Sequence, residues 1–246
     1  MHVVVEVSGY AFAHGVSLTR ATLRAWQRDP AGVVGRWTAG AALAAAGLLA
    51  AVWLISTLEL RDQVIALRPP FAVGDGADAV GVIERNLLVL ALHAMACVAG
   101  FIAGSSLPLQ AEHHDGSSRW VHEHGGRLAI AFVVAATTFS LSTQALMIGR
   151  ALGRVAGYLG VSPGVLLLGV MPHAIPELIA LFLPLAAWII ASRRGQWEQL
   201  LAATIVTVAI AVPVLVASAM VEVYVSPHVF TSLTGIQAPA PGATGH

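Results

Sequence analysis

The sequence predicts an all-α, polytopic membrane protein: a bundle of about five transmembrane helices. Of its 246 residues, 57% are hydrophobic and only 11% are charged, and the mean hydropathy is +0.78. A soluble domain carries about 25% charged residues. A membrane-spanning helix needs roughly 20 apolar residues. Runs of suitable length cover residues 37–58, 87–107, 128–149, 165–191 and 200–225.

The segments that flank the spans have a different character. Residues 1–36 form an N-terminal arm without a basic start followed by an apolar core, so no cleavable signal peptide is expected. Within it, residues 17–27 predict an amphipathic helix on the membrane surface, with Arg20, Arg24 and Arg28 on its polar face. Residues 37–227 form the bundle. Residues 228–246, rich in Pro, Gly and Ala towards the end, predict a flexible tail.

Arginine alone supplies the positive charge, and its distribution predicts the orientation. Eight arginines lie on the side of the N-terminus, in the arm and in the second and fourth loops; five lie on the other side. Because basic residues favour the cytoplasmic face, we expect the N-terminus inside the cell and the C-terminus outside. The eight are Arg20, Arg24, Arg28, Arg36, Arg119, Arg127, Arg193 and Arg194.

Small residues recur at four-residue spacing at two places. Gly100 and Gly104 lie at the end of the second span, and Gly149 and Gly153 at the end of the third. Small side chains at this spacing let helix backbones approach closely. Packing within the chain is the first interpretation, and contact with a second copy is the alternative.

The fourth span contains an unusual polar segment, from Pro172 to Glu177. A carboxylate at the bilayer centre costs about 2.5 to 3.5 kcal/mol on insertion scales, so such residues normally face other helices or a cavity. Pro172 and Pro176 suit the first turn of a new helix, so we expect this span to be broken there. A hydrogen bond between His173 and Glu177, one turn apart, is the structural alternative to an ion site.

Polar residues of other spans fall in the same half of the membrane as this segment. At 1.5 Å per residue, each lies within a few turns of the same face. They predict one intramembrane polar cluster, comprising Asn86, His93, Gln144, Pro172, His173, Glu177 and Glu222.

Residues 86–227 resemble the stage II sporulation protein M family of integral membrane proteins. The family's Pro-His-Gly motif, with Glu three residues later, corresponds to MPHAIPEL, in which Ala174 replaces Gly. Its Glu shortly before a Pro corresponds to Glu222 and Pro227, and its Asn at the start of a span to Asn86. Gln144 and Ala145 replace a further Asn-Gly. The resemblance implies a cell-envelope membrane protein that assembles peptidoglycan-degrading enzymes on the outer side.

Three functions remain open. The first is a non-enzymatic scaffold or anchor that recruits cell-wall machinery. The second is an ion- or proton-coupled transporter or channel that uses His173, Glu177 and Glu222. The third is a metalloenzyme with His93, His173 and Glu177 as ligands, although no HExxH pattern is present.

The scaffold interpretation sets the remaining expectations. No catalytic residue, metal site or cofactor is expected. The expected partners are the lipid bilayer and membrane or outer-facing envelope proteins, and a homo-oligomer is an additional possibility. Nucleic acid is not an expected partner, because the net charge is zero. The single Cys97 is expected to be a small buried apolar residue. The His-rich loop, residues 112–124, is expected to be a solvated loop, with metal binding as the alternative.

Overall fold

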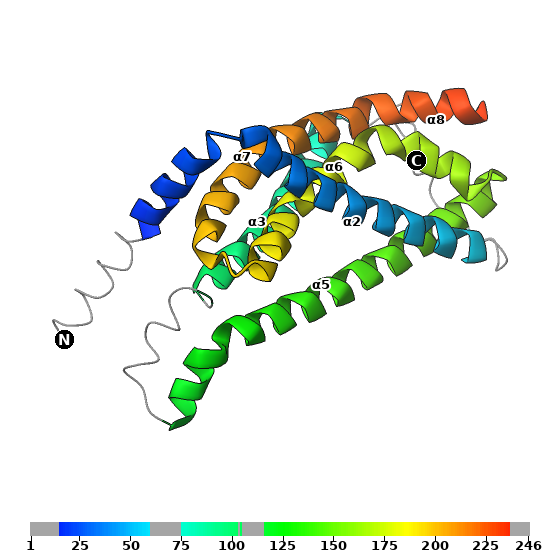
Figure 1. The fold of residues 1–246 in the computed structure, drawn as a ribbon. Helices are drawn as coiled ribbons and strands as arrows, with labels where there is room; N and C mark the ends of the chain where they lie inside the picture. Colours follow the sequence, from blue (N-terminus) through cyan, green and yellow to red (C-terminus); the bar gives the residue numbers. More distant parts are fainter. Residues whose placement is uncertain (1–14, 60–74, 103, 105–115, 237–246) are drawn as a thin grey trace. The chain divides into compact units, whose positions relative to one another are not determined.

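The computed structural model describes residues 15–59, 75–102, 104 and 116–236, and of residues 116–127 and 129 it describes only the backbone. The described chain is helical, without strands (Figure 1). After a helix at residues 15–26, the elements are α2 (Pro30–Glu59), α3 (Gly76–Phe101), α5 (Gly116–Leu159), α6 (Pro163–Arg193), a 3₁₀ turn η3 (Trp197–Gln199), α7 (Leu200–Met220), a π-helical turn η4 (Val221–Val225) and α8 (Ser226–Thr234).

Five helical segments are long and apolar enough to cross a membrane: α2, α3, residues Ile130–Leu159 of α5, α6, and the run Trp197–Thr234. The predicted all-α fold with five spans is therefore confirmed, and the chain is a multi-pass membrane protein.

Local sequence signals account for the helix ends. Asp29 caps α2 by accepting a hydrogen bond from Gly32 N at 2.9 Å. Asp75 and Asp78 form a reciprocal cap at the start of α3: Asp75 Oδ1 accepts from Ala77 N and Asp78 N, and Asp78 Oδ2 accepts from Asp75 N. At the other end of the long helices, Gly160 after α5 and Gly195 after α6 have positive φ, the conformation that terminates a helix at low cost.

The helix contacts divide the chain into two compact units. Unit 1 comprises Met1–Ala41, Leu90–Ala136 and Phe182–Ala211, and unit 2 comprises Ala42–Val89, Thr137–Leu181 and Val212–His246. Each long helix therefore contributes one part to each unit.

In unit 1, large aromatic side chains fill the space beside glycine. Trp188 and Leu200 are buried next to Gly100, where an added Cβ would lie 2.6 Å from Trp188 Nε1. Gly104 lies in the same way against the ring of Trp197. Cys97 is fully buried here, and its thiol donates a hydrogen bond to the Pro184 carbonyl at 3.2 Å. The helix at residues 15–26 belongs to this unit, and a Cβ added at Gly15 would lie 3.6 Å from Leu201 and 3.8 Å from Phe101.

In unit 2, the backbones of α2 and α5 approach closely at two glycines. A Cβ at Gly149 would lie 2.7 Å from Ile55 Cβ, and one at Gly153 would lie 2.8 Å from the Ser56 carbonyl oxygen. Glu59 adds ion pairs to Arg150 and Arg154 of α5, at 3.6 and 3.7 Å. The four glycines singled out for packing thus all serve contacts within the chain.

Three sequence expectations about the helices differ from the structure. α6 runs without a break from Pro163 to Arg193, so the break predicted at Pro172 and Pro176 is wrong. The fifth span continues past Val225 to Thr234, into residues expected to be a tail. α5 begins at Gly116, so residues 116–124 of the expected loop are helical, while residues 112–115 and the tail from 237 onward lie outside the described residues.

Candidate functional site

A polar seam runs between α6 and the last part of the fifth span in unit 2. His173 and Ser226 are both buried, and His173 Nδ1 shares a hydrogen bond with Ser226 Oγ at 2.7 Å. Glu177 lies one turn further along α6 and has Glu222 within electrostatic range. His173 and Glu177 are four residues apart on α6, and Glu222 and Ser226 are four residues apart on the fifth span. His173 is therefore level with Ser226, and Glu177 is level with Glu222, as expected of antiparallel helices.

α3 supplies two further members of the seam. Asn86 is buried at 9% exposure and its side chain approaches the Glu177 carboxyl group. Arg85 is exposed, donates from Nε to the Gly81 carbonyl at 3.3 Å, and lies within electrostatic range of both Glu177 and Glu222. We define the seam as Arg85, Asn86, His173, Glu177, Glu222 and Ser226.

The seam is not fully satisfied by hydrogen bonds. Asn86 Nδ2 and Glu177 Oε2 are buried atoms that have no hydrogen-bond partner of good geometry within the described part of the chain. An unpaired polar atom in an apolar interior costs free energy, about 1 to 3 kcal/mol from mutational data. The Asn86 side chain thus lies close to the Glu177 carboxyl group, but the two do not form a hydrogen bond of good geometry.

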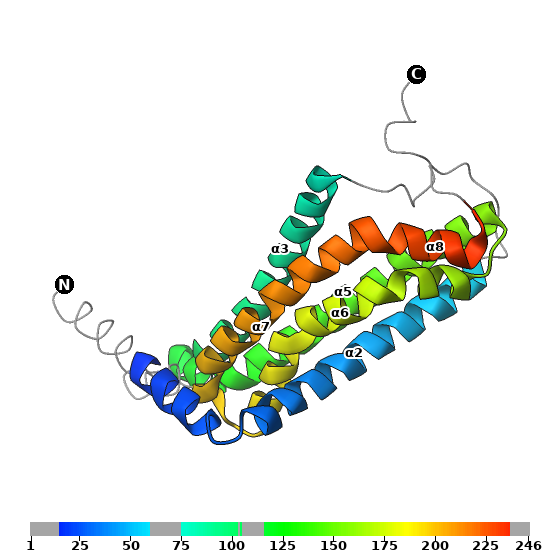
Figure 2. The ribbon, with the colours of Figure 1, turned by 90° about the horizontal axis from the view of Figure 1, so that it is seen from above.

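The backbone changes its winding where the fifth span joins the seam. Glu222 lies on the π-helical turn η4, and the Ser226 N–H donates to the Val221 carbonyl, five residues back. Pro227 explains the wide turn, since it has no N–H and its ring would press on the Val223 carbonyl of a regular α-helix. Beyond it, His228 Nδ1–H donates to the Tyr224 carbonyl at 2.9 Å. Figure 2 shows α8 following directly after α7, with a change of direction between them.

The structure brings together four of the predicted site residues: Asn86, His173, Glu177 and Glu222. The other three predicted site residues, His93, Gln144 and Pro172, lie outside the seam. Gln144 Nε2 donates to Ser140 Oγ on its own helix at 3.0 Å. His93 belongs to unit 1, where its ring lies 5.9 Å from that of Phe182. Pro172 is exposed.

Two seam residues were missing from the expected cluster, Ser226 and Arg85. The signal that could have found Ser226 is the four-residue spacing of Ser218, Glu222 and Ser226, which repeats on the fifth span the spacing of His173 and Glu177 on the fourth. Arg85 is adjacent to Asn86 in the sequence, but there it contributes only to the arginine distribution that predicts the orientation of the chain.

Metal chemistry finds no support in this arrangement. The described residues contain no group of three or more His, Cys, Asp or Glu side chains placed to hold a metal ion. The proposed ligand set of His93, His173 and Glu177 is not assembled, because His93 packs on Phe182 and His173 bonds to Ser226.

Comparisons of the chain with protein-family models, with curated proteins and with solved structures found no match.

Proposed function

We propose that this protein is a non-enzymatic scaffold of the cell envelope, anchored in the membrane by its five spans. The observation that carries the proposal is the buried hydrogen bond between His173 and Ser226, which joins α6 to the start of α8. A polar bond in this position fixes the rotation and register of two apolar helices that would otherwise slide past one another. A fixed end of the bundle is what an anchor for other proteins requires.

The accessible surfaces also favour a structural use of the seam. Of two pockets among the described residues, one is lined by residues of unit 1 and one by α2 and α6 residues of unit 2, and neither of these two has a seam residue in its lining. Beside the seam, the exposed side chains of Tyr224, His228 and Leu233 offer a surface for a partner. The resemblance of residues 86–227 to the stage II sporulation protein M family supports peptidoglycan-remodelling enzymes as partners.

A proton- or cation-coupled transporter is the second candidate, and the Glu177 carboxyl group favours it. One of its oxygens is buried without a hydrogen-bond partner among the described residues, and a second carboxyl group, that of Glu222, lies in electrostatic range. Two such groups inside a membrane span are costly unless a cation, a proton or Arg85 compensates them.

Replacing Glu177 by Gln distinguishes the two functions. An amide keeps the shape and can hydrogen-bond to Asn86, but it carries no charge and takes up no proton. For a scaffold, E177Q should melt within a few degrees of the wild type in detergent, complement a deletion strain and retain its co-purifying envelope proteins. Glu84→Gln is the matched control, since Glu84 lies exposed on α3 and outside the seam.

Normal melting of E177Q combined with lost complementation would overturn the scaffold proposal. A proton or cation flux in liposomes that wild type and E84Q support and E177Q does not would then establish the transporter.

A further inference from the structure

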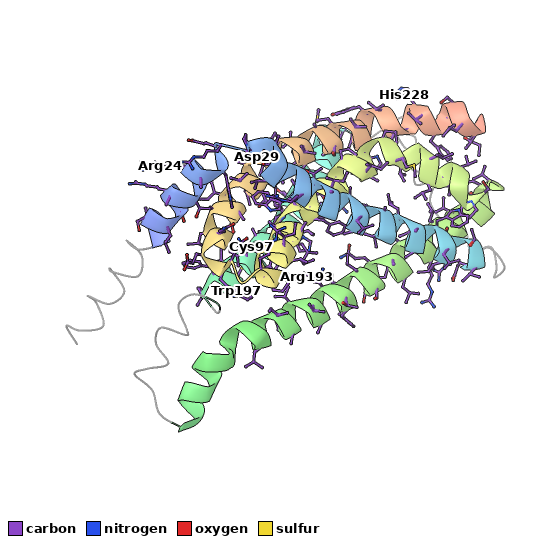
Figure 3. The ribbon with its side chains drawn as sticks, in the orientation of Figure 1. Arg24, Asp29, Cys97, Arg193, Trp197 and His228 are labelled. Carbon is purple, nitrogen blue, oxygen red and sulfur yellow. The ribbon has the colours of Figure 1, made fainter. Side chains whose placement is uncertain are left out.

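A pocket of about 180 Å³ lies within unit 1, where the start of α2 meets the end of α6 and the start of α7. Its polar lining comes from separate segments of the chain: Trp26, Arg36, Trp37, Arg194, Gln196 and Gln199. Apolar side chains of α6, such as Ile190, form the remaining wall. Figure 3 labels two neighbouring residues of this region, Arg193 at the end of α6 and Trp197 in η3.

The pocket is positively charged and holds no compensating acid. Arg36 and Arg194 both line it, and no lining residue is Asp or Glu. Within the described ranges, neither guanidinium group has an ion-pair or hydrogen-bond partner; the nearby Asp29 carboxylate caps α2 through Gly32 N. Two unpaired guanidinium groups and two side-chain amides supply hydrogen-bond donors of the kind that bind phosphate oxygens.

Three features place the pocket at the level of lipid headgroups. Trp26 and Trp37 meet edge to face with ring centroids 5.1 Å apart, at the end of a membrane span, where Trp side chains favour the interface. The helix at residues 15–26 exposes Arg20 and Arg24 beside it, and Figure 3 shows Arg24 pointing away from this helix. Finally, the apolar wall suits the glycerol and first acyl carbons of a lipid better than a free ion.

We propose that this pocket binds the phosphate headgroup of an anionic phospholipid. The phosphodiester lies between Arg36 and Arg194, the amides of Gln196 and Gln199 donate to its remaining oxygens, and the two Trp rings flank the glycerol. Bound there, the lipid joins the N-terminal helix, α2 and the turn after α6. This site does not depend on the function proposed above.

The test uses the full chain in detergent, titrated with short-chain phosphatidylglycerol or phosphatidylcholine while its melting temperature is followed. We expect phosphatidylglycerol to stabilise the protein saturably and phosphatidylcholine to have little effect. Arg36→Gln and Arg194→Gln should each weaken the apparent affinity about tenfold, the effect of losing one charge-assisted contact. Arg193→Gln, with the same charge change at an exposed position outside the pocket, should leave it within about twofold.

Three results would overturn the proposal. Equal stabilisation by both lipids would show that the headgroup charge is not recognised. A loss in R193Q as large as in R194Q would show that surface charge alone attracts the lipid. Inorganic phosphate that stabilises as well as phosphatidylglycerol at equal concentration would identify the ligand as a free anion. If R194Q alone lowers the melting temperature without lipid, R36Q, which removes the other guanidinium group of the lining, decides the question.

Discussion

His173 and Ser226 form a hydrogen bond that is short, buried and surrounded by apolar helices. Hydrogen bonds between membrane helices contribute about 0.6 kcal/mol on average and up to about 1.7 kcal/mol. We expect the upper part of this range here, because removing the Ser226 hydroxyl leaves the buried His173 Nδ1 without its partner.

Replacing Ser226 by Ala should therefore destabilise the protein by about 1 to 2 kcal/mol. Ser232→Ala is the matched control on the same helix, since Ser232 is exposed and only donates to the Val229 carbonyl. Melting temperature in detergent, followed by tryptophan fluorescence, measures both. Equal melting of S226A and S232A would mean that the His173–Ser226 bond does not hold α8.

The positions of polar residues in the spans predicted four of the six seam residues: Asn86, His173, Glu177 and Glu222. His173, Glu177 and Glu222 stand out because charge in a membrane span is costly. Ser226 gives no such signal, because serine can satisfy itself on its own helix. Depth along a span also says nothing about partners: Gln144 bonds to Ser140, and His93 lies seven residues, or about 10 Å, along α3 from Asn86.

At the scale of the helices, apolar length predicted each span but not where the helix ends. α5 and α8 extend beyond the apolar runs because their caps, not their hydropathy, end them: Gly160 and Gly235 both have positive φ. The break expected in α6 fails for a related reason. Prolines remove donors one at a time, and a packed membrane helix tolerates the freed carbonyls.

The contact between α2 and α5 leads to a prediction at this scale. Gly153→Ala should destabilise the protein by about 1 to 3 kcal/mol, because its Cβ would press on the Ser56 carbonyl, which is backbone and cannot move alone. Gly157→Ala is the control one turn further on, since nothing lies within 4 Å of the added Cβ. That control should be neutral or slightly stabilising, because Ala favours a helix over Gly. Thermal unfolding in detergent compares the pair; equal loss in both would refute the close approach.

For the whole molecule, the five spans of the described residues predict, if they alternate in direction, that the two ends of the chain lie on opposite faces of the membrane. The pocket shared by Arg36 and Arg194 agrees with this alternation, because it puts the start of the first span and the end of the fourth on one face. The assignment of that face to the cytoplasm stays a prediction from the distribution of arginine.

Cysteine labelling tests the topology with little background, since the single native Cys97 has no exposed surface. Arg28→Cys and Gly242→Cys should react with a membrane-impermeant maleimide from opposite sides of sealed vesicles. In whole cells only G242C should react if the N-terminus is inside. Labelling of both positions from the same side would contradict the five-span arrangement.

The wide turn at Val221–Val225 has the geometric effect of one inserted residue. Removing one residue from it would restore ordinary winding with little rotation of the chain downstream, because the deletion takes out the residue that the wide turn accommodates. Ser226 would stay beside His173, and Phe230 would keep its buried place against Gly169. A deletion within the regular winding of α7 has no surplus residue to absorb it and would turn every later side chain by about 100°, so we expect the protein to tolerate the loss of a residue far better at the wide turn than in α7.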